Sequence, residues 1–347
     1  MSGTSLDGLD IAYCHLSQRS NKEWKYSIKR ATTIKYSTAW AKRLAGAQLL
    51  DAPALLELDA EYGNYLGKAC EKFIQQGKHA VDFIASHGHT VFHQPSRGFT
   101  YQIGNGNAIH AACGLPVIYD FRSLDVQLGG QGAPLVPVGD KLLFGEYDVC
   151  LNLGGIANLS MEIKKTRIAY DVCFLNMGLN LLAGQAGKQY DENGQMASRG
   201  DVNAKLLAKL NTIYSSLRKK RPSLGREIFE QRMQPLLLTK DVSLEDKLRT
   251  FTEASAFEIA NAIVAGKKNA KVLCTGGGTF NSFFVSCLLD HCGDHAALII
   301  PEEVVVKFKE ALVFSFLGVL RWQQRPNCLM SVTGARRDSS GGVLVGL

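Results

Sequence analysis

Three glycine-rich turns in the chain have the composition of phosphate-binding loops. They are SGTSLDG at residues 2–8, GGIAN at 154–158 and TGGGTFN at 275–281. Backbone N–H groups at such turns, together with hydroxyl and amide side chains, form concave sets of donors for phosphate oxygens. Any one of these turns alone is better explained as an ordinary structural turn. The three together favour a nucleotide held between two lobes, with Mg²⁺ bridging its phosphates.

The spacing of these turns excludes two common nucleotide-binding folds. None of them matches GxxxxGK[ST], the phosphate loop of the Walker type, and no GxGxxG with a downstream acid marks a dinucleotide fold. A different nucleotide-binding architecture is therefore expected.

Carboxylates near the turns are candidates for proton transfer and metal binding, and they are Asp7, Asp10, Asp120, Asp125 and Asp171. Asp171 lies inside an apolar stretch, between IAY and VCF, where an unpaired charge is costly to bury. The pattern fits a functional carboxylate. It also fits a structural carboxylate satisfied by its neighbours, or a strand residue that faces outward.

The stretch SHGHTVFH at residues 86–93 has histidines at a spacing that first suggests a metal site. No cysteine or acid lies close enough in the sequence to complete a tetrahedral zinc set, and Gly88 indicates a turn. We therefore favour hydrogen bonding of His87 to a polar ligand such as a sugar. A histidine satisfied within the core remains the alternative.

The elements that must position these residues follow from apolar periodicity. Residues 37–77 predict two helices, the second capped by Asp51 and ended by Gly77. Further helices are expected at 201–216, 243–266 and 307–321, and strands at 9–13, 81–86, 99–103, 117–121, 149–153, 158–163, 271–275 and 298–301. This alternation, with hairpins early in each half, indicates an α/β protein with mixed sheets.

Two segments of the chain echo one another. SGTSLDGLDIAY and NLGGIANLSMEI both read as strand, small-residue turn and strand. A duplicated domain, with each half presenting a hairpin loop to a shared cleft, produces such an echo. Two short glycine-rich hairpins also arise by coincidence, so the echo alone leaves duplication open.

Length and composition limit the remaining possibilities. The 347 residues, 46% hydrophobic and 20% charged, suit a soluble globular protein of two domains or one large α/β unit. The net charge of +7 suits an anionic small molecule and is modest for nucleic-acid binding. The nine cysteines form no CxxC pair, so we expect reduced, buried thiols. No apolar run approaches the roughly 18 residues of a membrane span and no signal-peptide pattern is present, which predicts a cytoplasmic protein.

Six groups of motifs, taken in order along the chain, resemble those of the anhydro-N-acetylmuramic acid kinases. They are MSGTSLDGLD, SHGHT with QIGNGNAI, DFRSLDVQLGGQGAPLVP, LNLGGIANLS, YDVCFLNMGLN and CTGGGTFN. The resemblance covers essentially the whole chain. It implies the duplicated two-lobe, actin-like ATPase (ribonuclease H-like) fold with mixed sheets and an interdomain cleft that closes around ATP. We expect a first lobe at 1–145 and a second at 146–347, with its last residues available to pack back on the first.

The implied enzyme acts on 1,6-anhydro-N-acetylmuramic acid with ATP and Mg²⁺. Water opens the anhydro bridge at C1 while O6 accepts the γ-phosphoryl group, giving N-acetylmuramic acid 6-phosphate and ADP in cell-wall recycling. By the resemblance, Asp171 is the general base and Asp7 lies near the metal through the phosphates. The implied cofactor-binding residues are Gly3, Thr4, Ser5, Asp7, Gly8, Asp10, Gly154, Gly155, Asn158, Gly276, Gly277 and Gly278, and the implied substrate-binding residues are His87, Arg122, Asp125 and Glu310.

Two other functions fit the same residues. One is a kinase for another hexose or amino sugar, and the other is a non-kinase actin-like ATPase or binding module. Relatives usually carry several residues ahead of MSGTS, so we expect either a trimmed or late start, or a lobe that lacks an edge-strand segment and anchors its first loop weakly. No nucleic-acid or membrane partner is expected, and a homodimer is an expectation that the sequence does not decide.

Overall fold

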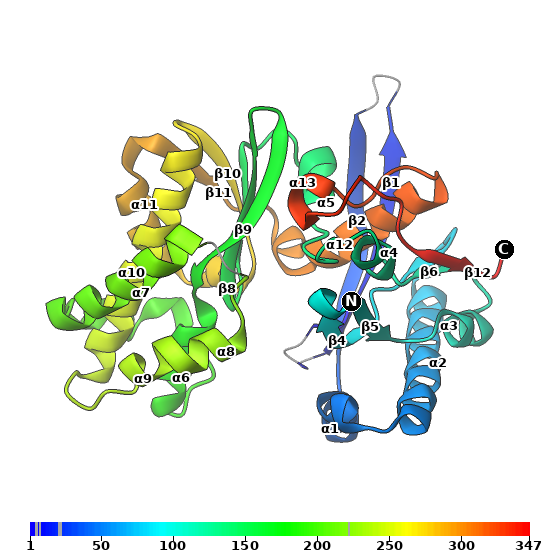
Figure 1. Ribbon diagram of the computed structural model, residues 1–347, viewed down its shortest axis with the longest axis horizontal. Coiled ribbons are helices and arrows are strands. Elements are labelled where there is room, and N and C mark those ends of the chain that lie inside the picture. The colour runs from blue at the N-terminus through cyan, green and yellow to red at the C-terminus, as the bar shows by residue number, and fades with distance from the viewer. Residues whose placement is uncertain (4–5, 7, 20–22, 221–222) are drawn as a thin grey trace. The chain divides into compact units, whose positions relative to one another are not determined.

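The computed structural model describes residues 1–347 except 4–5, 7, 20–22 and 221–222 (Figure 1). The chain divides into two compact units. Unit 1 consists of Met1–Leu143 and Phe308–Leu347, and unit 2 is Phe144–Lys307. The first boundary lies two residues from the expected one. The expected second lobe is too long, however, because its whole segment 308–347 belongs to unit 1, where β12 (Val343–Val345) pairs with β6 (Val117–Tyr119).

The described strands of unit 1 form three small sheets. Strands β1 (Gly8–Gln18) and β2 (Trp24–Lys35) form a long antiparallel pair, in which Gly8 lies opposite Lys35. Strand β3 (Ile84–Ala85) runs parallel to β6 in a sheet of order β12-β6-β3. Strands β4 (His89–Gln94) and β5 (Phe99–Ile103) form a separate hairpin.

Helix α2 (Ala52–Gly77) provides one wall of the unit 1 core. As predicted, Asp51 caps it by accepting a hydrogen bond from the Ala54 N–H at 3.0 Å, and the helix ends at Gly77. It packs on α3 (Gly106–Cys113) at two glycines. A Cβ on Gly63 would lie 2.6 Å from the carbonyl oxygen of Asn105, and a Cβ on Gly67 would lie 2.6 Å from that of Ile109. Because glycine has no side chain, the backbones of the two helices approach closely at these positions. The other helices of unit 1 are α1 (Thr38–Gly46), α4 (Ser123–Gln127), α5 (Pro137–Leu143) and α13 (Met330–Thr333).

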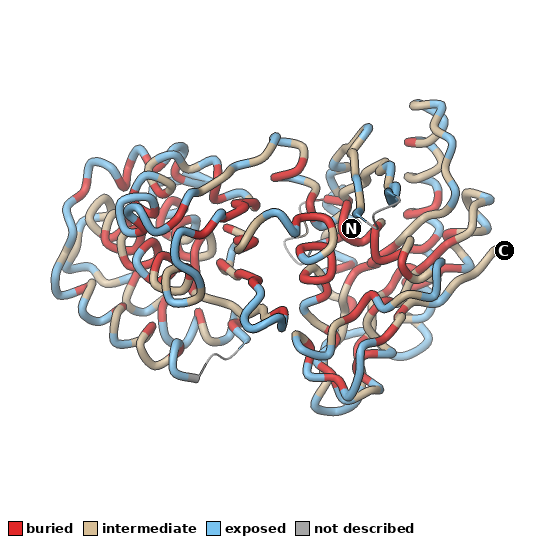
Figure 2. The backbone as a smooth tube through the Cα atoms, turned by 90° about the horizontal axis from the view of Figure 1, so that it is seen from above, coloured by how far each residue is buried: buried red, intermediate tan, exposed pale blue. Residues whose placement is uncertain are grey.

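Unit 2 is built on one mixed sheet of order β11-β10-β7-β8-β9. Strands β11 (Ala296–Ile299), β10 (Ala270–Thr275) and β7 (Val149–Leu153) are parallel, whereas β8 (Ile156–Ile163) and β9 (Thr166–Phe174) continue from β7 as an antiparallel meander. The predicted α/β class with mixed sheets is confirmed. Figure 2 shows the buried residues gathered inside each unit, with exposed residues on the outer turns.

Helices cover this sheet and complete unit 2. The long ones are α6 (Asn176–Gln185), α7 (Ala204–Lys220), α10 (Leu244–Gly266) and α11 (Ser282–Cys292). Helix α12 (Glu303–Trp322) begins in unit 2 and departs from helical geometry at Phe308, the first residue of the returning part of unit 1. Shorter turns are α8 (Arg226–Ile228), α9 (Gln234–Leu237), the π turn Phe229–Met233, and 3₁₀ turns at Ala47–Leu49, Pro95–Arg97, Glu192–Gly194, Ala197–Arg199, Gly277–Phe280 and Gly293–His295.

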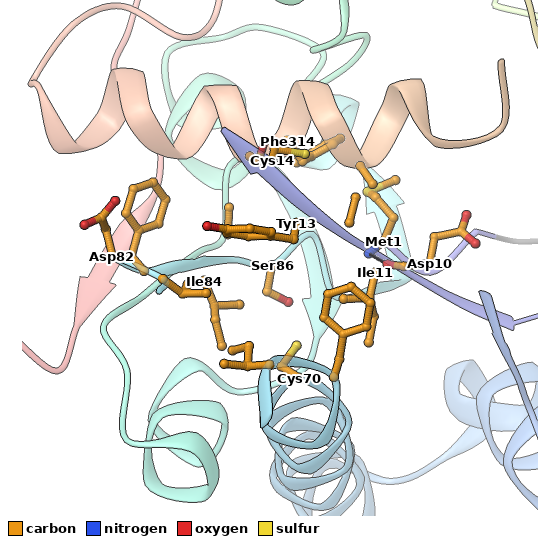
Figure 3. Close-up of a pocket in the computed structure, with 18 of the residues that line it drawn as sticks. Met1, Asp10, Ile11, Tyr13, Cys14, Cys70, Asp82, Ile84, Ser86 and Phe314 are labelled. Atoms are coloured by element: carbon orange, nitrogen blue, oxygen red, sulfur yellow. Dashed lines mark hydrogen bonds between the residues drawn. The ribbon is translucent and has the colours of Figure 1, made fainter. Parts of the chain in front are cut away.

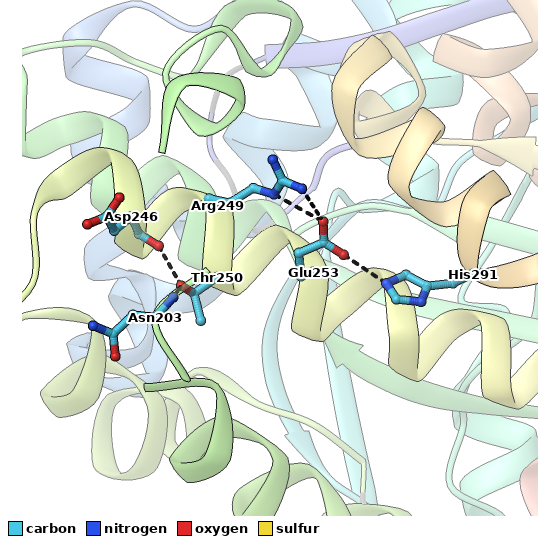
Figure 4. Close-up of polar contacts among 6 residues, drawn as sticks. All are labelled: Asn203, Asp246, Arg249, Thr250, Glu253 and His291. Atoms are coloured by element: carbon cyan, nitrogen blue, oxygen red, sulfur yellow. Dashed lines mark hydrogen bonds and ion pairs between the residues drawn. The ribbon is translucent and has the colours of Figure 1, made fainter. Parts of the chain in front are cut away.

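Polar contacts along α10 fasten the loop that leads into α7 (Figure 4). The fully buried Thr250 hydroxyl donates to the Asp246 carbonyl at 2.6 Å and accepts from the Asn203 N–H at 2.9 Å. Because each buried polar group finds a partner, the loop is held without an unpaired donor at these positions.

The two echoing segments both contain an antiparallel pair among their described residues. In the second, Leu153 lies opposite Ala157, and in the first, Ser2 lies opposite Leu9. The predicted hairpin partner of residues 149–153 is therefore confirmed, with β8 starting two residues earlier than expected. Duplication of the whole unit remains an interpretation.

Candidate active site

Two of the three glycine-rich turns meet at one edge of the unit 2 sheet. Strands β7 and β10 are parallel neighbours with Asn152 opposite Thr275, and each strand ends directly before a glycine turn. We call the residues Gly154, Gly155, Gly276, Gly277 and Gly278 the glycine cluster. Since the carboxyl ends of parallel strands point the same way, the sheet itself brings the two turns together.

Glycine is required in the third turn for two reasons. Gly276 has a φ of +87°, in the region that L side chains rarely adopt, and a Cβ there would lie 2.5 Å from Asn152 Oδ1. A Cβ on Gly278 would lie 2.9 Å from the Leu153 carbonyl oxygen. By contrast, Gly155 has nothing within 4 Å of a Cβ and is exposed. The cluster thus has a packed inner side and an open outer side.

The start of helix α6 closes the second turn. The N–H groups of Leu175 and Asn176 donate to the carbonyls of Gly155 and Gly154 at 2.9 and 3.2 Å, and Asn176 Nδ2 donates to the Leu153 carbonyl at 3.0 Å. Sequence reasoning missed Asn152 and Asn176 as contributors. Their signal was present, because both stand inside the motifs LNLGG and FLNMG.

Asp171 lies on β9 directly opposite Asn158 of β8. Its Oδ2 accepts a hydrogen bond from the Leu224 N–H at 2.8 Å. Burial raises the pKa of the Asp171 carboxyl, and the Leu224 hydrogen bond opposes this shift. A carboxylate with a raised pKa binds a proton more tightly than one in bulk water, as a general base requires.

A cavity of about 230 Å³ adjoins Asp171 and contains a second carboxylate. Glu258 of α10 is 3% exposed and pairs with Arg218 Nη2 at 3.1 Å. Burial raises the pKa of Glu258, while the Arg218 charge opposes it. The sequence signal for Glu258 is a charged residue within a helix whose neighbouring positions are apolar, and it was not used.

Unit 1 contains an arginine held by a histidine. Arg122 Nε and Nη2 donate to the same atom, His87 Nε2, at 3.0 and 2.9 Å, and His87 Nδ1 donates to the Gly88 carbonyl at 3.1 Å. These contacts require the neutral imidazole with its proton on Nδ1. Burial and the neighbouring Arg122 charge keep the pKa of His87 well below its usual value. Burial likewise lowers the pKa of Arg122 to about 10, with the Glu310 charge opposing the shift.

The third guanidinium nitrogen of Arg122 is fixed by the loop at Gly132. Nη1 donates to the Gly132 carbonyl at 2.6 Å, and the Gly132 N–H donates to Asp125 Oδ2 at 2.7 Å. Asp125 Oδ1 accepts from the Thr333 hydroxyl at 2.8 Å and from the Cys328 thiol at 3.0 Å. Asp125 is only 1% exposed. Both Asp125 oxygens are thus occupied by groups of the protein, including the Gly132 N–H, and its predicted contact with substrate stays a prediction.

Glu310 and Asp10 complete the charged groups of unit 1. Glu310, on the part of α12 that belongs to unit 1, remains exposed to solvent, and desolvation by its surroundings raises its pKa against the charges of Arg122 and Lys309. Asp10 Oδ1 accepts from the Thr33 hydroxyl at 2.5 Å. Both carboxylates stand on elements that also carry core residues, so their backbones are well fixed.

The first glycine turn is described only in part, since Thr4, Ser5 and Asp7 lie outside the described residues. Gly3 is exposed, and Gly8 is buried so tightly that a Cβ would lie 2.7 Å from the Ile34 carbonyl oxygen. Asp120, weighed above as an acid, accepts a hydrogen bond from the N–H of Ser123, the first residue of α4, at 3.1 Å.

A chain of hydroxyl groups leads to the start of this turn. Tyr36 donates to the Ser2 hydroxyl at 2.8 Å and lies 2.6 Å from the Tyr62 hydroxyl, and Ser2 Oγ lies 3.1 Å from His89 Nδ1. With Tyr36 donating to Ser2, Tyr62 supplies the proton to Tyr36, while the direction of the Ser2–His89 hydrogen bond depends on the tautomer of the ring. Burial lowers the pKa of His89, which favours the neutral ring. Ser2 is 3% exposed, so this network fixes the residue that precedes the first turn.

Among the described residues, no three histidine, cysteine or acidic side chains come together to hold a metal ion, and no helix is long and apolar enough to span a membrane. A family model described as anhydro-N-acetylmuramic acid kinase matches residues 1–346.

The chain belongs to the anhydro-N-acetylmuramic acid kinase family.

Named relatives agree over nearly the whole chain. The anhydro-N-acetylmuramic acid kinase of Vibrio parahaemolyticus is 32% identical over 99% of this chain and 96% of its own length. That of Microcystis aeruginosa is 32% identical over 97% of this chain and 96% of its own. Among solved structures, the activator of the 2-hydroxyisocaproyl-CoA dehydratase from Clostridium difficile with bound ADPNP is 12% identical, with a TM-score of 0.42, and the match covers 90% of this chain and 98% of that one.

The predicted kinase residues fall into two sets. Unit 2 carries the glycine cluster, Asn158 and Asp171, while unit 1 carries His87, Arg122, Glu310 and Asp10. Within unit 1 the structure brings His87 and Arg122 into contact, and within unit 2 it brings the second and third turns into contact. The family match confirms the resemblance on which these expectations rest, and each residue's role remains a proposal.

Proposed function

We propose that the protein is an ATP-dependent anhydro-N-acetylmuramic acid kinase. It hydrolytically opens 1,6-anhydro-N-acetylmuramic acid and phosphorylates O6, yielding N-acetylmuramic acid 6-phosphate and ADP in the recycling of peptidoglycan. The observation that carries this proposal is the match of the family model to residues 1–346. The contact between two glycine turns at the edge of the unit 2 sheet supports the ATP requirement.

The glycine cluster is proposed to bind the phosphates of ATP. Gly155 and Gly277 are exposed. No atom lies within 4 Å of a Cβ built on Gly155, and the nearest atom to a Cβ built on Gly277 is 3.9 Å away, so the space in front of both residues is open to a phosphate oxygen. Backbone N–H groups approach phosphate most closely where no side chain intervenes. Asn158, opposite Asp171, offers an amide donor beside the same turn.

We propose that a magnesium ion accompanies ATP, as is usual for kinases. Mg²⁺ is commonly held by one or two carboxylates together with substrate phosphates, so the absence of a three-ligand cluster among described residues is compatible with it. We propose that Asp10, and Asp7 outside the described residues, face the metal. When bound, Mg²⁺ neutralises charge that develops on the transferring phosphoryl group.

Asp171 is proposed as the general base. The oxygen of a water molecule forms a bond to C1, its proton passes to the Asp171 carboxylate, and the C1–O6 bond breaks. O6 then bonds to the γ-phosphorus as the bond to ADP breaks. The raised pKa of Asp171 supports this role because it strengthens the carboxylate as a proton acceptor.

Arg122 is proposed to bind the lactyl carboxylate of the sugar. A half-buried guanidinium with one nitrogen fixed by Gly132 and two facing His87 keeps a single orientation, which suits a planar anionic partner. Glu310 supplies an acceptor for sugar hydroxyl groups from the same unit.

The test combines product analysis with one substitution. The wild-type protein with ATP, Mg²⁺, 1,6-anhydro-N-acetylmuramic acid and ¹⁸O water should place the label at C1 of a 6-phosphate product. Asp171→Asn should lower turnover by about 10²- to 10⁴-fold and leave ATP binding largely intact. Phosphorylation of an unmodified amino sugar without label would favour the other sugar kinase, and ATP consumption independent of sugar would favour a non-kinase ATPase.

We further propose a cytoplasmic location, in keeping with a soluble kinase of this family and with the absence of a membrane-spanning helix among the described residues. Fractionation of the source cells tests the location. Sedimentation velocity tests the expected homodimer.

A further inference from the structure

A buried ion pair joins α5 to α12 inside unit 1. Lys309 Nζ lies 2.7 Å from Asp140 Oδ1, and the two side chains are only 7% and 5% exposed. Taking two charges out of water is costly, and their attraction repays this cost only when the geometry is well defined. None of the roles proposed above uses these two residues, so the pair calls for an explanation of its own.

Helix α12 is interrupted just before this pair. Phe308 has φ −118° and ψ 17°, outside helical geometry, and it is the first residue of the part of α12 that belongs to unit 1. Because an irregular residue breaks the run of helical turns, the residues before Phe308 do not fix the rotation of those that follow. Contacts within unit 1 must therefore set this rotation.

Two contacts with α5 hold one face of this part of α12. Lys309 and Val313 are four residues apart, so their side chains lie on the same face of the helix. Lys309 pairs with Asp140, and Val313 packs on Gly139, where a Cβ would lie 2.6 Å from Val313 Cγ2. Glycine thus permits the close approach of the two helices, and the ion pair fixes which side chains meet there.

A neighbouring face of α12 carries Glu310 and Phe314, which are also four residues apart. The Phe314 ring, which borders the cavity of about 290 Å³ drawn in Figure 3, meets the His87 ring edge-on with centroids 4.8 Å apart. The Arg122 guanidinium lies 6.0 Å from the centre of the same Phe314 ring. Glu310 therefore stands one helical turn before the residue that packs on the His87–Arg122 contact.

Rotation of the helix links the two faces. Successive residues of an α-helix lie about 100° apart around its axis, so holding Lys309 against α5 also fixes the direction of Glu310. A rotation that separated Lys309 Nζ from Asp140 Oδ1 would leave two uncompensated charges in the core, which is strongly unfavourable. An apolar contact such as that of Val313 on Gly139 carries no comparable penalty for a small rotation.

We propose that Asp140 and Lys309 are positioning residues for the sugar site. Their ion pair sets the rotation of α12 after Phe308 and holds the Glu310 carboxylate on the side of Arg122, where it accepts hydrogen bonds from sugar hydroxyl groups. This role rests on the proposed function, in which Glu310 and Arg122 bind the anhydro-sugar. Sugar affinity then depends on two buried residues that do not touch the sugar.

The first test removes both charges and measures KM and kcat. The double variant Asp140→Ala/Lys309→Met avoids the unpaired buried charge that either single substitution would leave. Its KM for 1,6-anhydro-N-acetylmuramic acid should rise about fivefold, with kcat changed less than about twofold. Lys309→Arg keeps the ion pair and should retain the wild-type KM. Lys307→Met, which removes an exposed ion pair with Glu303 on the same helix, is the matched control and should also leave KM unchanged.

A cycle with Glu310→Gln shows whether the pair acts through Glu310. Glu310→Gln alone should raise KM, and adding the double substitution should raise it by less than about twofold further, because the positioned group is already altered. An equal rise in both backgrounds would overturn the proposal, as would an unchanged KM in the folded double variant.

A second variant perturbs the same face of α12 without touching the charges. Gly139→Ala places a Cβ 2.6 Å from Val313 Cγ2, so it should displace α12 and raise KM about threefold or more. This rise should also shrink in the Glu310→Gln background. An unchanged KM in folded Gly139→Ala would contradict control of Glu310 by the α5 contacts.

Deuterium exchange tests the anchoring of α12 without turnover. Amides of residues 311–316 should exchange at least about fivefold faster in the double variant than in the wild type, with β7 and β10 of unit 2 as the internal reference. Unchanged exchange of 311–316 would overturn the anchoring. A wild-type protein that does not phosphorylate the anhydro-sugar would overturn the proposed function and this role together, which separates that failure from a failure of the ion pair alone.

Discussion

Arg122 directs two of its guanidinium nitrogens, at 3.0 and 2.9 Å, toward the single Nε2 atom of His87. The histidine accepts from the arginine because its other nitrogen donates to the Gly88 carbonyl. The imidazole thereby acts as a fixed acceptor that sets the plane of the guanidinium.

His87→Ala should raise KM for the anhydro-sugar by about tenfold and change kcat less, because the arginine loses orientation but keeps its charge. His87→Gln, whose Oε1 accepts from the same donors, should recover most of the loss. His93→Ala, an exposed position on β4, is the matched control. Steady-state kinetics over sugar concentration gives the answer, and an unchanged KM in His87→Ala would remove this role. Because the pKa of His87 lies well below its usual value, the wild-type KM should not change between about pH 6 and pH 8.

Gly276→Ala should weaken ATP binding by about tenfold or more, because the new Cβ meets Asn152 Oδ1 at 2.5 Å in a backbone conformation with φ +87°. Gly155→Ala, where the Cβ position is open, is the matched substitution and should reduce binding much less. Calorimetric titration with a non-hydrolysable ATP analogue compares them. Equal effects at both positions would argue that the packed side of the glycine cluster does not shape the phosphate site.

Asp171 should give turnover an acid limb at a higher pH than an ordinary aspartate would, because burial raises its pKa and only the carboxylate accepts a proton. The pH dependence of kcat measures this. The same shift also makes the stability of the fold depend on pH. The folded state binds this proton more tightly than the unfolded state, so the free energy of unfolding falls as pH rises from the unfolded pKa to the folded pKa. Asp171→Asn lacks that loss and should be no less stable than wild type at pH 7 in urea denaturation. A destabilised variant would indicate a mainly structural carboxylate.

Asp125→Asn should lower the free energy of unfolding by about 2–4 kcal/mol, since an amide nitrogen would face donors that now bind a buried carboxylate. Sugar affinity should fall with it, because the Gly132 loop carries the contact to Arg122. Asp82→Asn, at an exposed site in the same unit, provides the comparison. Urea denaturation and sugar titration together test the positioning role; stability equal to that of the Asp82 variant would contradict it.

Glu253→Gln should destabilise unit 2 by no more than about 1 kcal/mol. Burial favours a raised pKa for Glu253, but hydrogen bonds from His291 and Arg249 outweigh it and lower the pKa (Figure 4). The stabilisation is therefore present above the unfolded pKa and is lost as pH falls through the folded one. Denaturation at neutral pH and near pH 3 should show the difference between wild type and variant shrinking in acid.

Sequence patterns located most elements because strong local signals marked them. Asp51 and Gly77 define α2, and the buried strand 149–153 appears with its predicted bounds. Strand β2 was not predicted, since its alternation of lysines and arginines with apolar residues is that of a half-exposed strand whose pairing depends on β1. The return of residues 308–347 to unit 1 was only partly anticipated, because pairing of β12 with β6 is a long-range contact.

Candidate site residues were predictable in type more than in role. The glycines of the second and third turns were predictable from local composition, and the parallel pairing of β7 with β10 brings the two turns together. Asp125 and Arg122 are close in sequence, and both were predicted to contact substrate. Only the three-dimensional contacts of Gly132, Cys328 and Thr333 show that Asp125 is enclosed and Arg122 is positioned by it.

The split composition of unit 1 has a consequence for biosynthesis. Unit 2 is one uninterrupted stretch, Phe144–Lys307, so a ribosome completes it while unit 1 still lacks Phe308–Leu347. Asp125 can form its hydrogen bonds with Cys328 and Thr333, and β6 can pair with β12, only after that segment has been synthesised. Because domains generally fold as they emerge from the ribosome, we expect unit 2 to complete its fold before unit 1. The loop that holds the arginine facing His87 gains its contacts through Asp125 only after residues 328 and 333 have been synthesised.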